Sequence, residues 1–271
     1  MTTSDGPNPT EFYGARYSPE RQRLKDQVFA EVYDDYFGQS SWVSTADYDR
    51  FIGWLEVTTS SRVLDIACGA GQPALRLVSR TGCSVVGIDS SKEAIASAIA
   101  LAKQRGLSSK ALFECADAGK QLAFDDCSLD AVVCIDALSH LADHPSVFAE
   151  WTRILKPQGR VVFTDQVLTG SISNHEVAAR SPHGHFLLVL DGYDAKELEK
   201  AGFEIVRHVD ITSTFAAIAA RHCAARTRHA DALRSAEGDE DFEVQNRYRR
   251  TAETLAKEKR LSHFAFLARK R

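Results

Sequence analysis

The stretch Val63–Ala74, VLDIACGAGQPA, decides how the rest of the chain is interpreted. An apolar run ends at Ala67, and two glycines, Gly69 and Gly71, follow at once. Glycine at these positions lets the backbone turn tightly and lets a ligand approach without a Cβ in the way. Pro73 suits the first turn of a helix, where its missing N–H is not needed. The pattern predicts a strand, a glycine loop and a helix at the carboxyl edge of a parallel sheet, where such folds bind ligands.

Strand and helix patterns alternate beyond this stretch. Apolar runs predict strands at 62–67, 84–89, 110–117, 129–136 and 159–167, with helical patterns between them. Strict alternation indicates parallel strands joined by right-handed crossovers, and therefore an α/β fold. Two helical segments precede the first strand, the second of them capped by Ser44 or Thr45, and the chain ends with a predicted strand at 260–270.

Composition limits the class of partner. The 271 residues carry a net charge of -4, with 44% hydrophobic and 26% charged residues, as in an ordinary soluble globular protein. A nucleic-acid partner would need a basic face, and a membrane partner an apolar run of spanning length, so neither is expected. The N-terminal residues lack a signal-peptide pattern. The six cysteines form no CxxC pair, so we expect reduced, mostly buried thiols, no metal site and a cytoplasmic protein.

Two classes of cofactor compete for the glycine loop. GAGQPA fits the dinucleotide fingerprint, and Asp89 lies twenty residues after Gly69, as an NAD enzyme would require. Asp65 points to the other class, because a carboxylate there would repel a pyrophosphate and attract a cationic cofactor. Asp117, at the end of the third strand, suits an adenine amino group, which needs a hydrogen-bond acceptor. The final strand, which follows a helical insertion, also favours a cationic cofactor, because doubly wound dehydrogenases need not have such a strand.

Several segments resemble the successive motifs of class I S-adenosylmethionine-dependent methyltransferases. They are VLDIACGAGQPALRLV, VVGIDSS, ECADAGKQLAFDDCSLDAVVCIDALSHL and RILKPQGRVVFTDQV, which together cover about residues 60–210. The resemblance implies a Rossmann-like, seven-stranded, mostly parallel sheet with helices on both faces and an antiparallel last strand. It also implies S-adenosylmethionine as the methyl donor and S-adenosylhomocysteine as the product.

The resemblance also assigns the cofactor-binding residues. Asp65 and the loop residues would lie against the methionine part of the cofactor, Asp89 would hold the ribose hydroxyls, and Asp117 and Ala118 would hold the adenine. The full set that it implies is Asp65, Ala67, Gly69, Gly71, Asp89, Ser90, Asp117, Ala118 and Ile135.

The methyl acceptor is expected beside CIDALSHLADH, at the end of the fourth strand. Asp136 and His140 are four residues apart and are predicted to share one helical face. A carboxylate there would bind a cationic amine, and the histidine would take a proton near neutral pH. His144, just ahead of Pro145, is expected to be exposed.

A narrower resemblance concerns the acceptor. VYDDYFGQSSWVS, residues 32–44, followed by DALSH, resembles the arrangement in phosphoethanolamine N-methyltransferases. That resemblance implies that Tyr33 lines the pocket, that Asp136 holds the amine and that His140 assists proton removal, with Tyr17 as a partner for His140. The phosphate-gripping residues of that family have no convincing equivalent here.

Two further segments are candidates for substrate contact. SPHGHF, residues 181–186, offers His183 or His185 to a substrate rather than to a metal. The charged helical segment 213–259 is interpreted either as a solvated face or as a lid that would shield the methyl donor from water. In the second case Arg221, Arg226 or Arg247 would face an anionic substrate group.

The expected organisation is an N-terminal helical cap (1–58), a methyltransferase core (59–212), a helical lid (213–259) and the final strand of the core (260–271). The expected function is methyl transfer from S-adenosylmethionine to a small molecule, first of all to an amine nitrogen. Oxygen or carbon methylation in natural-product metabolism is the alternative. An NAD-dependent oxidoreductase and a non-catalytic cofactor-binding protein are weaker alternatives, and a homodimer stays open.

Overall fold

The computed structural model describes residues 19–182 and 186–271. At its centre is an eight-stranded sheet, in which seven strands run in the order β3-β2-β1-β4-β5-β8-β7 and β6 pairs with β5 off that path. β8 is antiparallel to both of its neighbours, and the other pairings are parallel. The predicted Rossmann-like α/β fold with an antiparallel last strand is confirmed. The strands are β1 (Arg62–Ile66), β2 (Ser84–Asp89), β3 (Ala111–Cys115), β4 (Leu129–Cys134), β5 (Leu155–Leu168), β6 (Val189–Leu190), β7 (Phe203–Asp210) and β8 (Leu261–Lys270).

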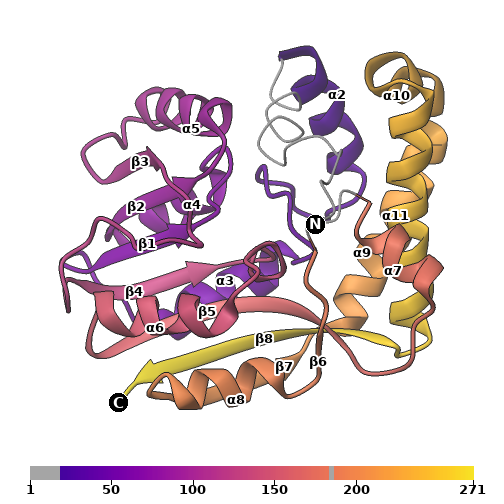
Figure 1. Cartoon of the computed structure of the whole chain (residues 1–271). Helices are drawn as coiled ribbons and strands as arrows, with labels where there is room; N and C mark the ends of the chain where they lie inside the picture. The colour runs from indigo at the N-terminus through magenta and orange to yellow at the C-terminus, as the bar shows by residue number, and fades with distance from the viewer. Residues whose placement is uncertain (1–18, 183–185) are drawn as a thin grey trace, which may run out of the picture.

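Helices cover both faces of the sheet (Figure 1). Successive strand residues point to opposite faces, so Val63 packs in the cluster of one face and Leu64 in the cluster of the other. This burial on both sides explains why the strands read as continuous apolar runs. One face carries α3 (Thr45–Leu55), α4 (Gln72–Thr81) and α5 (Lys92–Gln104), and the other carries α6 (His144–Ile154) and α8 (Tyr193–Lys200).

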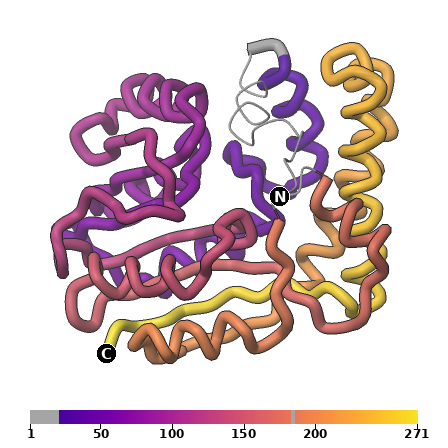
Figure 2. Tube along the Cα trace, in the orientation of Figure 1, coloured from indigo at the N-terminus to yellow at the C-terminus, as the bar shows by residue number. Residues whose placement is uncertain are grey.

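A third apolar cluster joins the N-terminal helix to the helices inserted between β7 and β8. Val28 of α2 packs there with Phe215 of α9 and Leu255 of α11, and all three side chains are buried. Figure 2 shows the N-terminal segment beside these late helices, although they are far apart in the sequence. The helices of this part are α2 (Pro19–Ala30), α9 (Thr212–Arg228), α10 (Ala230–Glu237) and α11 (Asp239–Lys257).

Two elements between β5 and α8 were not predicted. α7 (Asn174–Arg180) begins at a capping box formed by Ser173 and Glu176, and the two-residue strand β6 extends the sheet. Both are too short to produce a periodic pattern, although the capping pair is readable in the sequence. β5 also begins at Leu155, earlier than expected.

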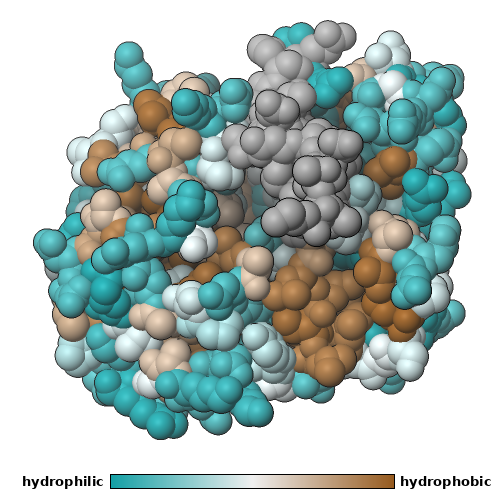
Figure 3. Space-filling view, viewed as in Figure 1, coloured by the Kyte–Doolittle hydropathy of each residue, from teal (hydrophilic) through white to brown (hydrophobic). Residues whose placement is uncertain are grey.

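The face of the molecule shown in Figure 3 carries both polar and apolar side chains. On the face shown in Figure 3, apolar side chains gather around the chain that leads into β6, and Leu190 of β6 is 68% exposed. Among the described residues, no helix is both long enough and apolar enough to cross a membrane.

Candidate active site

The loop after β1 is held against the end of β2. Ala67, Gly69 and Gly71 all have left-handed backbone, with φ of 54°, 55° and 82°. The Cys68 N–H donates to the Ile88 carbonyl (3.0 Å), and the Gly69 N–H donates to Asp89 Oδ2 (2.9 Å). These bonds fix the loop at the carboxyl edge of the sheet, as the sequence predicts.

Gly71 serves packing rather than ligand approach. A Cβ at this position would lie 2.8 Å from Ala98 Cβ and 2.9 Å from Phe113 Cζ, so it would point into the packing between α4, α5 and β3. Gly71 does not line the cavity described next. The positive φ and this close approach both require glycine at position 71.

A cavity of about 830 Å³ opens at the carboxyl edge of the sheet and extends to the helices α2, α9, α10 and α11. This volume lies in the range of small-molecule sites. Tyr33, like Gly71, is outside the lining. The other predicted site residues line the cavity together: Asp65, Ala67, Gly69, Asp89, Ser90, Asp117, Ala118, Ile135, Asp136 and His140.

Asp65 is the unusual acid of the cavity. Its side chain is 4% exposed, and its Oδ2 has no hydrogen-bond partner among the described residues. Burial, and then the charge of Asp89, raise the pKa of Asp65 to about 7. An unpaired buried carboxyl group is unfavourable unless a ligand satisfies it, so this position favours a cationic group.

The two other acids at the strand ends are tied to the backbone. Asp89 accepts from the N–H groups of Gly69 and Ser91, although burial outweighs these bonds and raises its pKa. Asp117 is exposed, and the N–H of Gly119 at 2.9 Å lowers its pKa. Three carboxyl groups from the ends of β1, β2 and β3 thus line one side of the cavity.

Asp136 already has protein partners for both of its oxygens. Oδ1 accepts from the Thr164 hydroxyl (2.7 Å) and lies 2.7 Å from His263 Nε2, while Oδ2 accepts from the Trp42 N–H. Burial raises the pKa of Asp136, but His263, Thr164 and the Trp42 N–H outweigh it, so the pKa lies below its usual value. The carboxylate is therefore stabilised as an anion by the protein itself.

Asp136 and His140 do not share a helical face. Asp136 has φ of 54°, and the chain then forms only the short 3₁₀ turn η2 (Leu138–His140). Asp136 thereby turns toward the sheet, where it meets Thr164 and His263. His140 lines the cavity, and its ring packs against Phe186 with centroids 4.4 Å apart.

Tyr33 lies behind the cavity wall. Its side chain is buried, its hydroxyl donates to the Ser41 carbonyl, and its ring packs near Phe29, Tyr36 and His222. Tyr17, His183 and His185, the other residues predicted near the substrate, lie outside the described residues.

The expectation that His144 is exposed is wrong. His144 is completely buried, with Nδ1 2.8 Å from Asp194 Oδ1 and Nε2 3.1 Å from the Leu138 carbonyl. It is the first residue of α6, and it points inward to α8, which carries Asp194. The neighbouring Asp143 caps the helix instead.

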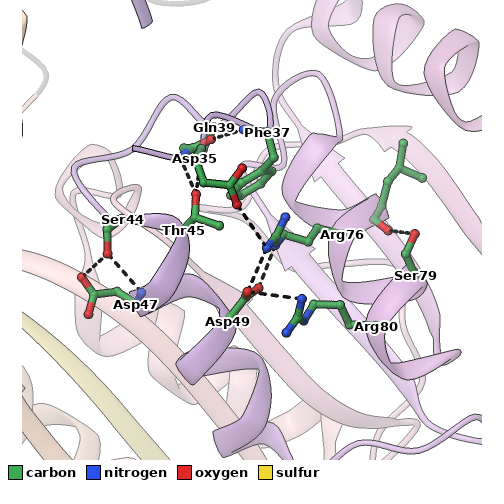
Figure 4. A network of polar contacts seen from close by, with 11 residues as sticks. Asp35, Phe37, Gln39, Ser44, Thr45, Asp47, Asp49, Arg76, Ser79 and Arg80 are labelled. Atoms are coloured by element: carbon green, nitrogen blue, oxygen red, sulfur yellow. Dashed lines mark hydrogen bonds and ion pairs between the residues drawn. The ribbon is translucent and has the colours of Figure 1, made fainter. Parts of the chain in front are cut away.

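A polar network fastens the segment between α2 and α3 to the helix that follows the glycine loop (Figure 4). Arg76 of α4 makes two hydrogen bonds to Asp49 of α3, at 2.7 and 2.8 Å, and its guanidinium lies over the Phe37 ring. Arg80 reaches the same carboxylate at 3.3 Å. Bidentate arginine–carboxylate pairs hold geometry well, so this network positions the segment that carries Trp42.

Of the three arginines considered for the lid, only Arg226 lines the cavity, and it is paired with Glu237 at 2.7 Å. Arg221 pairs with Asp34, and Arg247 is exposed. Two glutamines and a further arginine that were not predicted also line the cavity: Gln166, Gln245 and Arg249. Gln245 and Arg249 are four residues apart on one helix. Side chains at that spacing are neighbours, so their contact could have been predicted from the sequence.

His222 was also missed. It is 4% exposed and lines the cavity, and its Nδ1 has no hydrogen-bond partner among the described residues. Burial, followed by the charges of Arg249, Arg226 and Lys25, holds the pKa of His222 well below its usual value. This histidine is therefore a neutral acceptor rather than a strong base.

Known proteins share this architecture. Residues 64–163 match the family model described as a methyltransferase domain. The chain is 32% identical over 191 residues to the 27-O-demethylrifamycin SV methyltransferase of Amycolatopsis mediterranei, and the match covers 67% of the chain and 70% of that protein. The chain belongs to the methyltransferase family. The methyl donor of this family is S-adenosylmethionine.

Other methyltransferases match over less of their length. Methyltransferase GfsG of Streptomyces halstedii is 32% identical, over 58% of both proteins. A phosphoethanolamine N-methyltransferase of Triticum aestivum is 28% identical, and the match covers 82% of the chain but only 45% of that enzyme. The chain thus spans 58% of the length of the first of these relatives and 45% of the length of the second.

The fold extends beyond methyl transfer. The crystal structure of the [4+2]-cyclase SpnF superposes with a TM-score of 0.73, at 24% identity, over 96% of this chain and 94% of that one. The likeness shows the fold, and the residues of the site must carry the chemistry.

Proposed function

We propose that this methyltransferase transfers the methyl group of S-adenosylmethionine to an oxygen of a small molecule. The observation that carries this proposal is the occupied carboxylate of Asp136. A nitrogen acceptor was predicted because a free carboxylate there would hold a cationic amine. Thr164, His263 and Trp42 already contact both of its oxygens, so the protein itself balances most of the charge that an amine would need.

The residues present fit S-adenosylmethionine. Asp65 Oδ2 is buried and has no partner in the described ranges 19–182 and 186–271, and the cofactor carries two cationic groups, an ammonium and a sulfonium. We propose that Asp65, Ala67 and Gly69 contact its methionine part, that Asp89 and Ser90 hold the ribose, and that Asp117, Ala118 and Ile135 surround the adenine. Gly71 supports this set by shaping the loop. When bound, the cofactor supplies an electrophilic methyl group.

His140 is the candidate base. It follows β4, lines the cavity and is held by Phe186. In the proposed step the acceptor oxygen forms its bond to the methyl carbon as the carbon–sulfur bond breaks. The hydroxyl proton passes to His140, and the two electrons of the broken bond stay on sulfur. Tyr33, whose hydroxyl is bonded to the Ser41 carbonyl, supports the wall and is not proposed to touch the substrate.

The helices outside the sheet would enclose the acceptor. We propose that residues 1–58 form a cap and residues 213–259 a lid on the core, 59–212, which the strand in 260–271 completes. Support comes from the apolar cluster in which Val28, Phe215 and Leu255 meet, because it binds α2 to α9 and α11 beside the cavity. Such an enclosure would exclude water from the methyl donor.

Transfer of labelled methyl groups tests the proposal. Labelled S-adenosylmethionine would be offered with pooled phenols, alcohols, carboxylic acids and amines, using the wild-type chain, His140→Gln and the exposed control His208→Gln. We expect label on a hydroxyl oxygen, a loss of roughly 10²-fold or more in kcat for His140→Gln, and no loss for the control. Label found only on amines would refute the oxygen acceptor.

A further inference from the structure

Behind one wall of the cavity lies a buried cation, Arg180, which has no counter-ion among the described residues. Arg180 of α7 is completely buried, and among the described residues no carboxylate lies within ion-pair distance of it. Its guanidinium lies 4.0 Å from the centre of the Tyr248 ring, and it donates to the Tyr248 carbonyl and to Gln166 Oε1. Within the described part of the chain, its Nε has no hydrogen-bond partner.

This contact fixes the orientation of Gln166. Arginine has donors and no acceptor, so the amide atom that faces Arg180 must be the oxygen. The amide nitrogen of Gln166 is therefore the atom turned the other way. Gln166 lines the cavity, and no described residue accepts a hydrogen bond from its Nε2.

Gln245 repeats the arrangement on α11. Arg249 Nη1 donates to Gln245 Oε1 at 2.7 Å, so arginine again takes the amide oxygen. Gln245 also lines the cavity, and its Nε2 likewise donates to no described residue. Two arginine–glutamine pairs, one joining α7 to β5 and one within α11, thus leave two amide NH₂ groups for a ligand.

Cationic side chains outnumber the two acids at this end, Glu237, which pairs with Arg226, and Asp241. Lys25, Arg226 and Arg249 lie close enough to His222 to depress its pKa, and Arg180 lies behind the Trp42, Phe186 and Tyr248 side chains that line the wall. Positive charge favours oxygen acceptors and disfavours a cationic ligand.

We infer that Gln166 and Gln245, oriented by Arg180 and Arg249, determine substrate specificity by donating to two acceptor oxygens of the substrate. The substrate class is an apolar molecule with paired carbonyl or carboxylate oxygens. The inference rests on the proposed function, because it describes the acceptor end of the same cavity.

Isosteric replacements test it by binding alone. Gln166→Glu and Gln245→Glu keep the shape of the side chain but turn the cavity-facing donor into an acceptor. The exposed Gln104→Glu is the charge control. The probes are 1-naphthoate, which offers two oxygen acceptors, and 1-naphthylmethylamine, which offers a cationic donor instead. Each probe is titrated by calorimetry into the full chain saturated with S-adenosylhomocysteine.

We expect the wild-type chain and Gln104→Glu to bind the carboxylate more tightly than the amine, and each cavity variant to lose about tenfold in carboxylate affinity. Gln166→Glu should also raise the melting temperature, because Arg180 gains a counter-ion, which shows that the side chain at position 166 still faces Arg180. Equal or amine-first binding by the wild type, or unchanged affinities in both variants, overturns the inference. This experiment measures binding and not turnover. A chain that does not methylate oxygen would still show the preference for the carboxylate if the recognition is right, so the two proposals fail separately.

Discussion

The Nε2 atom of His263 lies 2.7 Å from Oδ1 of Asp136, and this contact joins the last strand of the sheet to the end of β4. Both side chains are almost or completely excluded from solvent, at 0% and 8% exposed. Asp136 also accepts from Trp42, in the segment between α2 and α3. One carboxylate therefore connects the core, the final strand and the N-terminal segment over the cavity.

Asp136→Asn should destabilise the chain strongly. The substitution removes the buried charge to which the Thr164 hydroxyl and the Trp42 N–H donate, and loss of a hydrogen bond to a charged group costs about 1.5–3 kcal/mol. The free energy of unfolding, from urea denaturation, measures it. The exposed pair of Glu204 with Arg269 gives the control: Glu204→Gln should leave the denaturation midpoint unchanged. Equal denaturation midpoints for the two variants would show that Asp136 does not stabilise the contact between β4, β8 and the N-terminal segment.

The raised pKa of Asp65 predicts a pH-dependent stability. Its folded-state pKa of about 7 lies above the unfolded value of roughly 4, so the folded state holds the proton more tightly. The contribution is therefore fully present below pH 4 and is lost as the pH rises through 7. Asp65→Asn should flatten this part of the stability curve, measured as the urea midpoint of the ligand-free protein between pH 4 and 8.

The same group predicts the pH dependence of cofactor binding. If the ionised Asp65 holds the ammonium group, affinity for S-adenosylhomocysteine should rise with pH by up to about tenfold per unit below pH 7. Asp65→Asn should bind weakly and without this slope, while Glu114→Gln, an exposed acid of β3, should keep it. An unchanged slope in Asp65→Asn would assign the titration to another group.

A pair of glycine substitutions should have opposite signs. Gly71→Ala should destabilise by roughly 1–3 kcal/mol, because φ is 82° and the new Cβ meets Ala98 at 2.8 Å. Gly53→Ala, inside α3 with nothing within 4 Å of the added Cβ, should stabilise by roughly 0.5–1 kcal/mol. Thermal unfolding of both variants is the measurement, and a neutral Gly71→Ala would contradict the close packing at the loop.

The sequence predicted the sheet and one end of the cavity because those features are local. Asp65, Asp89 and Asp117 each follow an apolar strand, and parallel strands bring their carboxyl ends to one edge. The partners of Asp136 were not predictable in this way, because Thr164 and His263 belong to strands whose pairing no periodicity reveals. The same applies to Arg180, whose position depends on α7, a helix of seven residues with little pattern of its own.

The buried cluster of His144, Asp165 and Asp194 illustrates the same limit and allows a matched test. Ligand atoms of the three residues lie within 4.8 Å of one another. Burial, followed by the charge of Asp194, raises the pKa of Asp165 well above its usual value. Asp194 Oδ1 lies 2.8 Å from His144 Nδ1.

Two isosteric variants should therefore differ at this cluster. Asp165→Asn replaces a buried carboxyl group, whose charged form burial disfavours, by a neutral amide and should change the free energy of unfolding by less than about 1 kcal/mol at pH 7. Asp194→Asn disturbs the buried contact of Oδ1 with His144 Nδ1 and should cost about 1–3 kcal/mol. Denaturation with urea at pH 7 compares them. Equal losses would contradict the raised pKa of Asp165, and a melting temperature that rises on addition of Zn²⁺ would show that the cluster binds a metal instead.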